Sequence, residues 1–197
     1  NPVSNRALEG GRHEAVWENP HPTPAYLFAI AAGALGRVTS TVRTAEGREV
    51  ELNIWAEPGD VERCRYALGA VERSLRWDEQ RFGRCYDLDV FNVVAAQDFT
   101  MGAMENKGLN IFNARYILAD EATATDADFL AIESVVAHEY LHNWSGNRVT
   151  LRDWFQLSLK EGLTVFRDTE FSSDLHSRAL KRIEVVRLLR SRQFPED

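Results

Sequence analysis

The residues with the clearest chemical potential are two histidines and a glutamate in the segment His138-Glu139-Tyr140-Leu141-His142. If this segment is helical, His138 and His142 lie one turn apart and about 40° around the axis, so their imidazoles can converge on one metal ion. Glu139 is rotated by about 100° from His138 and therefore stands beside the metal without binding it. From that position it can act as the general base that takes a proton from metal-bound water.

A third metal ligand is expected at Glu161, nineteen residues after His142. Residues 146–152 give the chain room to turn back, so that a second helix packs antiparallel to the first and presents Glu161 to the histidine pair. Two histidines and one glutamate leave a fourth position open for water, which is typical of a catalytic zinc site rather than a structural one. We also expect Gly162 to permit close helix contact, and Asp168 is a candidate partner for a ligand histidine.

A five-residue motif of this kind also arises by chance on surface helices. Here the neighbouring residues of the helix expected at 127–145 are strongly apolar, so the helix must be largely buried. Buried imidazoles and carboxylates without a partner would be costly. The polar residues 125–128 are a helix start signal and Gly146 is a stop signal, while Tyr140 is expected in the core. The motif and the third ligand together favour a zinc enzyme.

The second candidate site is a substrate-binding segment made of Met101, Gly102, Ala103, Met104, Glu105 and Asn106. An enzyme that cleaves beside a free N-terminus must hold the substrate ammonium next to the scissile carbonyl, and Glu105 is a carboxylate that the expected metal does not use. At an effective dielectric of about 20, an ammonium–carboxylate contact of about 4 Å contributes on the order of 4 kcal/mol before desolvation. Gly102 and Ala103 can present backbone to a peptide as an added strand, and Met101 can line a pocket of broad specificity. In isolation, the segment would be an ordinary strand-to-turn connection.

Together these motifs resemble the aminopeptidase N family of gluzincin zinc metallopeptidases, and in particular its bacterial branch. Residues 102–106 are similar, residue for residue, to the exopeptidase motif of that family, and the resemblance extends from about residue 20 to the end of the chain. The third-ligand motif, Lys160-Glu161-Gly162, departs from the more widespread Asn-Glu-x form but keeps the ligand. The resemblance implies one Zn²⁺ per chain and peptide substrates with a free N-terminus.

The resemblance also implies an oxyanion-binding tyrosine on a later helix, and none of the 36 residues after Glu161 is a tyrosine. Loss of one oxyanion donor typically costs about a hundred- to a thousandfold in turnover. The family's preceding β-rich domain, which contributes a further substrate contact, and its C-terminal helical domains are also expected outside these residues. We therefore expect a fragment of an aminopeptidase that is weak or inactive by itself.

Composition limits the remaining classes of function. The 197 residues carry a net charge of -7 with both signs spread along the chain, which argues against a nucleic-acid partner. No stretch approaches the roughly 20 apolar residues of a membrane helix, so no membrane partner is expected. The two cysteines, Cys64 and Cys85, are far apart, which favours reduced thiols and, with the bacterial resemblance, a cytoplasmic location. We expect the full-length protein to be a monomer.

The elements that position the candidate site follow from hydrophobic periodicity. Strands are expected at 13–17, 26–32, 38–43, 49–56, 88–95 and 109–112, and helices at 60–82, 127–145, 154–169 and 177–192. This order predicts an α+β fold, and the resemblance implies a thermolysin-like catalytic domain. We place a boundary near Gly36: residues 1–36 would end a β-rich N-terminal domain, and residues 37–197 would form the catalytic domain, truncated at its C-terminus. His13, His21 and His176 are expected to be solvated loop residues.

Three functions remain open from the sequence. The first is the zinc aminopeptidase, which depends on a free α-amino group. The second is a zinc endopeptidase of thermolysin type, against which Glu105 argues. The third is a non-catalytic module that uses zinc only for stability, in which Glu139 would have no role.

Overall fold

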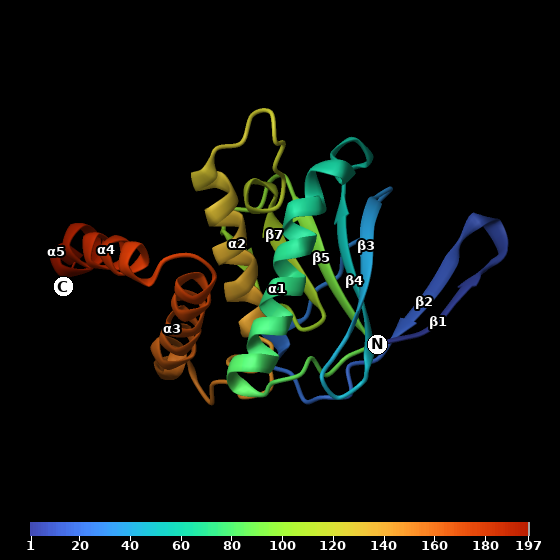
Figure 1. Cartoon of the computed structure of the whole chain (residues 1–197). Helices are drawn as coiled ribbons and strands as arrows, with labels where there is room; N and C mark the ends of the chain where they lie inside the picture. Colours follow the sequence, from blue (N-terminus) through green and yellow to red (C-terminus); the bar gives the residue numbers. More distant parts are fainter. Residues whose placement is uncertain (197) are drawn as a thin grey trace.

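A computed structural model describes residues 1–196, which form a mixed five-stranded sheet with helices on one face (Figure 1). The strands are β1 (Pro2–Ala7), β2 (His13–Trp17), β3 (Gly36–Arg43), β4 (Glu49–Ala56), β5 (Val90–Ala96), β6 (Ala103–Met104) and β7 (Leu109–Asn113). The α-helices are α1 (Arg65–Phe82), α2 (Asp126–Leu141), α3 (Leu157–Leu175), α4 (Arg178–Leu188) and α5 (Phe194–Glu196). The predicted α+β class is confirmed.

The sheet has the strand order β3-β4-β5-β7-β6. Strands β3 and β4 form an antiparallel hairpin, whereas β4, β5 and β7 run parallel. The two residues of β6 pair antiparallel with β7, so β6 is an edge strand. The substrate-binding segment expected from the sequence therefore lies at one edge of the sheet.

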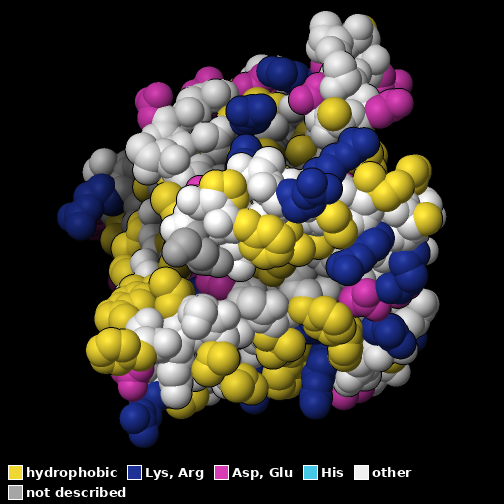
Figure 2. Space-filling view, turned by 90° about the vertical axis from the view of Figure 1, so that its left-hand side faces the viewer, with side chains coloured by type: hydrophobic (Ala, Val, Ile, Leu, Met, Phe, Trp, Pro, Cys, Tyr) yellow, Lys and Arg dark blue, Asp and Glu magenta, His cyan; other side chains and the backbone are white. Residues whose placement is uncertain are grey.

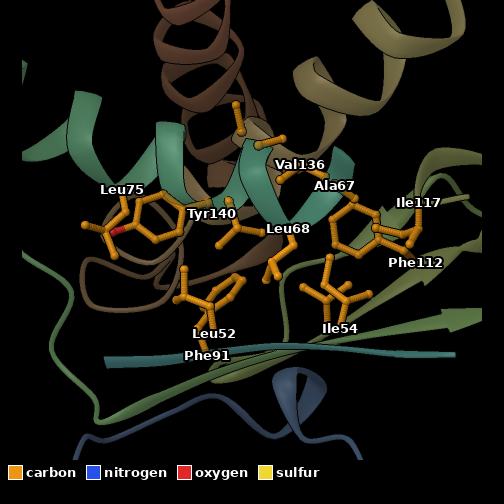
Figure 3. Close-up of a cluster of buried hydrophobic side chains, with 14 of the residues drawn as sticks. Leu52, Ile54, Ala67, Leu68, Leu75, Phe91, Phe112, Ile117, Val136 and Tyr140 are labelled. Atoms are coloured by element: carbon orange, nitrogen blue, oxygen red, sulfur yellow. The ribbon is translucent and has the colours of Figure 1, made fainter. Parts of the chain in front are cut away.

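The core lies between the sheet and helices α1 and α2. Figure 3 shows Leu52 and Ile54 of β4 pointing toward Leu68 of α1, with Tyr140 of α2 beside them. Each fully buried leucine or isoleucine contributes about 1.5–3 kcal/mol relative to an exposed one. Tyr140 is buried, as predicted, and it packs against Phe91 of β5, so its face of α2 turns toward the sheet.

Two N-terminal features differ from the prediction. Strand β1 was not expected, and it pairs with β2 in a separate two-stranded sheet that extends away from the body of the molecule (Figure 1). The strand expected at 26–32 is wrong, because Ala25–Leu27 is a 3₁₀ turn and the following residues pair with no strand of the described chain. Leu27 is buried instead, and its carbonyl accepts a hydrogen bond from the side chain of Asn106.

The helices agree with the prediction in place but not in length. A 3₁₀ turn, Pro58–Cys64, precedes α1, and α2 ends at Leu141 rather than near residue 145. Helix α3 continues to Leu175, six residues beyond the expected end. The last expected helix is interrupted by a π turn at Leu189–Gln193.

Hydrophobic side chains are exposed on α3 and α4. Figure 2 shows this side of the molecule, where yellow side chains are spread over the surface. The exposed residues of α3 and α4 include Leu159, Leu163, Phe166, Leu180 and Ile183, and Phe194 of α5 is also exposed. Within residues 1–196, no helix combines the length and the apolar character that crossing a membrane requires.

Candidate active site

The C-terminal end of α2 carries two of the proposed ligands. A capping box between Thr125 and Asp128 starts the helix, as the polar residues at this point predicted. The helical spacing brings the rings of His138 and His142 to a centroid distance of 4.6 Å, with their Nε2 atoms 3.0 Å apart. Both rings therefore present Nε2 to the same point.

Helix α3 brings the third proposed ligand to this point. The Oε2 atom of Glu161 lies 3.2 Å from Nε2 of His138 and 3.4 Å from Nε2 of His142. The expected role of Gly162 is wrong, because a Cβ at this exposed position would meet no neighbouring atom within 4 Å. Gly146 is the glycine that the packing requires. Its φ is +140°, and a Cβ there would lie 2.9 Å from Nδ1 of His142.

The three donor atoms fit a zinc ion. Ligand atoms about 2.0–2.1 Å from a tetrahedral zinc lie about 3.3 Å from one another, which matches the separations of His138, His142 and Glu161. Burial lowers the pKa of His138, but hydrogen bonds to Asp168 and Glu161 outweigh it and raise the pKa to about 10. Hydrogen bonds from both histidines hold the pKa of Glu161 well below its usual range. The site stabilises positive charge at the point where a cation would bind.

The other ring nitrogens are held by fixed partners. Nδ1 of His138 lies 2.7 Å from Oδ2 of Asp168, and Nδ1 of His142 lies 2.7 Å from the carbonyl oxygen of Ser145. Thr164 of α3 is a further neighbour of the His142 ring, at 3.1 Å. When Nδ1 carries the proton and donates it to these acceptors, the lone pair of Nε2 is left for a metal.

Glu139 is buried beside the donor triangle but is not part of it. Its carboxylate lies in a second group with Glu105 and His142, in which the possible ligand atoms are within 4.8 Å of one another. Burial raises the pKa of Glu139 to about 8, opposed by His138 and reinforced by Glu105 and Glu161. Such a carboxylate can both accept and release a proton near neutral pH.

The residues of the segment from Met101 to Asn106 differ in exposure and in contacts. Within residues 1–196, strand β6, formed by Ala103 and Met104, pairs with β7 alone, which leaves its other edge without a partner strand. Met101 is 67% exposed, so at most one side of it lines a pocket. A Cβ on Gly102 would make only ordinary contact with Tyr116, so the packing does not demand glycine there. Asn106 is buried and bonds to Leu27, which is a structural contact.

Lys160 is the residue that sequence reasoning missed. Its Nζ is paired with the buried carboxylate of Glu105 and lies 2.9 Å from Oε1 of Glu161. We expected Glu105 to be a carboxylate that the metal does not use, and the structure also gives it a cationic partner. The signal was its place in Lys160-Glu161-Gly162, because adjacent helical residues differ by about 100° and both can face one site.

The remaining histidines, His13, His21 and His176, lie outside this site. His13 is an exposed residue of β2, not of a loop. His21 lies 3.2 Å from the carboxylate of Asp87, and His176 is paired with the buried Glu133. The expectation of a solvated loop residue is confirmed for His176, which is exposed in the turn after α3, whereas the side chain of His21 is largely buried.

Known proteins are similar in sequence to this chain. A model of the peptidase family M1 domain matches residues 66–196. The chain belongs to peptidase family M1. Aminopeptidase N of Caulobacter vibrioides and aminopeptidase N of Escherichia coli are each 57% identical to this M1 chain over all 197 residues. The resemblance inferred from the motifs is confirmed.

A solved structure has a similar fold. Aminopeptidase A of Legionella pneumophila, crystallised in complex with aspartic acid, has a TM-score of 0.88 and 38% sequence identity, covering 92% of this chain and 21% of that protein. The M1 chain spans 23% of the length of each of the two curated relatives named above.

Proposed function

We propose that this M1 chain carries the site of a zinc-dependent aminopeptidase, with one zinc ion held by His138, His142 and Glu161. The observation that supports it most is the juxtaposition of the donor triangle with two further buried carboxylates, Glu139 and Glu105. When bound, zinc would supply a Lewis acid that polarises the scissile carbonyl and acidifies water.

Glu139 would move the proton. Its carboxylate takes a proton from the attacking water as the new C–O bond forms, and it then gives that proton to the nitrogen of the leaving amine as the C–N bond breaks. Burial keeps this carboxylate away from bulk solvent, and its place next to His138 holds it beside the ligands without joining them. The same carboxylate therefore serves both proton transfers.

Glu105 would bind the substrate ammonium, and the charge of the site supports this. The site contains four carboxyl groups, those of Glu105, Glu139, Glu161 and Asp168, and one ammonium, that of Lys160, so three negative charges remain when all four carboxyl groups are ionised. A zinc ion neutralises two of them, and a substrate ammonium would neutralise the third. The unpaired edge of β6 would hold the peptide backbone, with Met101, Gly102, Ala103, Met104 and Asn106 as the proposed contacts around Glu105.

A zinc endopeptidase of thermolysin type is the second candidate. The pairing of Glu105 with Lys160 favours it, because a carboxylate that already has a cation attracts a substrate ammonium less strongly. The two candidates differ in their response to a blocked N-terminus, since only the aminopeptidase requires a free ammonium.

Several broader proposals accompany the activity. We propose that residues 1–36 end a β-rich domain and that residues 37–197 belong to the catalytic domain. We also propose a cytoplasmic, monomeric full-length protein that acts on peptides of broad sequence. Turnover by this chain alone is expected to be slow, because the oxyanion tyrosine implied by the resemblance is not among its residues.

The test is the selectivity of Glu105→Gln. An alanyl chromogenic substrate and its N-acetylated twin are compared for wild type and variant, both loaded with zinc. We expect wild type to prefer the free amine and Glu105→Gln to lose most of this preference. Equal cleavage of both substrates by wild type would reject the aminopeptidase and favour the endopeptidase.

A further inference from the structure

The loop that follows α2 runs between the proposed zinc ligands and the proposed ammonium anchor. One residue of this loop, Asn147, is 5% exposed and is bonded to both. Its backbone N–H donates to the carbonyl oxygen of His142 at 3.0 Å, and its side-chain Nδ2 donates to the carbonyl oxygen of Glu105 at 3.0 Å. Asn147 thus connects the backbone of a metal ligand directly to the backbone of Glu105, 42 residues earlier in the chain.

The loop around Asn147 is itself fixed against the site. Ser145 accepts the Nδ1 hydrogen bond of His142, and Gly146 packs against both the His142 ring and the Lys160 side chain. The N–H of Gly146 donates to the carbonyl of Val149, which closes the loop. The contacts with His142 therefore fix the position of Asn147. The hydrogen bond from Asn147 to the backbone of Glu105 then fixes Glu105 relative to His142.

This connection has a consequence for an enzyme that removes one residue at a time. The ammonium and the scissile carbonyl of its substrate belong to the same residue, so Glu105 and the metal must keep a fixed separation. A misplacement of about 1 Å can cost about a hundredfold in rate. On the basis of the proposed function, we propose that Asn147 is a positioning residue that sets this separation. It thereby restricts cleavage to the peptide bond that follows the first residue of a substrate with a free N-terminus.

Neighbouring asparagines do not make the same connection. Asn106 donates to the carbonyl of Leu27 and Asn110 donates to the carbonyl of Asn106, so both hold the segment around Glu105 to the sheet and to the N-terminal residues. Within the described chain, neither forms a hydrogen bond to α2 or to the loop after it. Asn147 is the amide that joins the segment to the ligand-bearing helix.

The experiment measures binding rather than turnover, so slow catalysis does not obscure it. The zinc-loaded chain is titrated with alanine hydroxamate, which carries a free ammonium and a metal-chelating group, and with N-acetylalanine hydroxamate, which lacks the ammonium. The ratio of the two affinities reports how well the ammonium anchor is placed relative to the metal. Zinc affinity is measured separately by competition with a chromogenic chelator.

The variants are Asn147→Asp, which replaces the donor by an acceptor of the same shape, and Asn147→Ala, which removes it without adding charge. Asn53→Asp is the control, because Asn53 is an equally buried amide in the sheet, bonded to Glu51 and Asn92. We expect both Asn147 variants to lower the affinity ratio by about tenfold or more, because the lost bond leaves a buried carbonyl unpaired. Zinc affinity should change less than threefold, and Asn53→Asp should keep the wild-type ratio.

A wild-type ratio in both Asn147 variants would overturn the inference. A loss of zinc affinity with equal weakening of both probes would also overturn it, since that result indicates a purely structural role. If wild type itself does not prefer the free ammonium, the proposed function fails and the inference fails with it.

Discussion

Nδ1 of His138 lies 2.7 Å from the Oδ2 atom of Asp168. One face of α3 supplies both this carboxylate and the proposed ligand Glu161. The two acidic residues are seven positions apart, which is about two helical turns, so they lie on the same side of the helix. One helix thus provides a proposed ligand and the partner that orients another ligand. The metal site depends on the packing of α3 against α2 as much as on the ligands themselves.

Asp168→Asn is expected to weaken zinc binding by about 10- to 100-fold, because an uncharged amide supports the His138 ring less strongly than a carboxylate does. Competition with a chromogenic chelator measures the affinity. Asp174→Asn is the matched control on the same helix, since Asp174 bonds to Trp77 and Arg178 rather than to the site. Equal zinc affinity in wild type and Asp168→Asn would show that the contact has no such role.

Gly146→Ala is expected to weaken zinc binding and to lower the free energy of unfolding by more than about 1 kcal/mol. The reason is the positive φ of Gly146 together with the 2.9 Å approach of an added Cβ to Nδ1 of His142. Gly162→Ala is the control, because its Cβ meets no neighbour and alanine favours a helix by about 0.5–1 kcal/mol. Chemical denaturation and zinc titration of both variants check the pair, and an unaffected Gly146→Ala would contradict the packing described here.

Asp87→Asn is expected to destabilise the protein by about 2–4 kcal/mol at pH 7, because Lys107 and Arg148 would lose a largely buried counter-charge. Burial raises the pKa of Asp87, but Lys107 and Arg148 outweigh it and hold the pKa below its ordinary value of 3.8. A lowered folded pKa gives stability that is present above 3.8 and lost as the pH falls below it.

The stability difference between wild type and Asp87→Asn should therefore shrink as the pH falls below about 4. Asp89→Asn is the comparison, since Asp89 forms a more exposed ion pair with Arg48 and should matter by less than about 1 kcal/mol. Denaturant titrations at pH 7 and near pH 3.5 give the free energy of unfolding of wild type and of both variants at each pH. A difference for Asp87→Asn that grows in acid would refute the assigned sign.

Much of the site could be predicted because helical geometry is local. The spacing of His138 and His142 fixes their rings on one face of α2, and the distance in sequence to Glu161 allows one return connection. The same helical periodicity made Asp168 a candidate partner of a ligand histidine, because it lies about two turns after Glu161. The fold class followed equally from alternating and helical patterns.

The remaining features depend on tertiary contacts that no local pattern encodes. Lys160 pairs with Glu105 only because α3 packs beside the edge of the sheet, and Asn147 lies in a loop without periodicity. The apolar residues after Tyr26 suggested a strand, but they have no partner strand in the described chain and Leu27 is buried as a single anchor. Burial and pairing outweighed strand propensity at this point.

The most direct measurement is hydrolysis of the alanyl chromogenic substrate and its N-acetylated twin by the zinc-loaded chain and by Glu139→Gln. The variant keeps the three proposed ligands, so zinc binding should be unchanged while hydrolysis falls by about 10²- to 10⁴-fold. We expect all measurable cleavage to be of the free-amine substrate and Glu139→Gln to lower it by this factor. Cleavage by zinc-loaded Glu139→Gln at close to the wild-type rate, or equal cleavage of both substrates, would contradict this prediction.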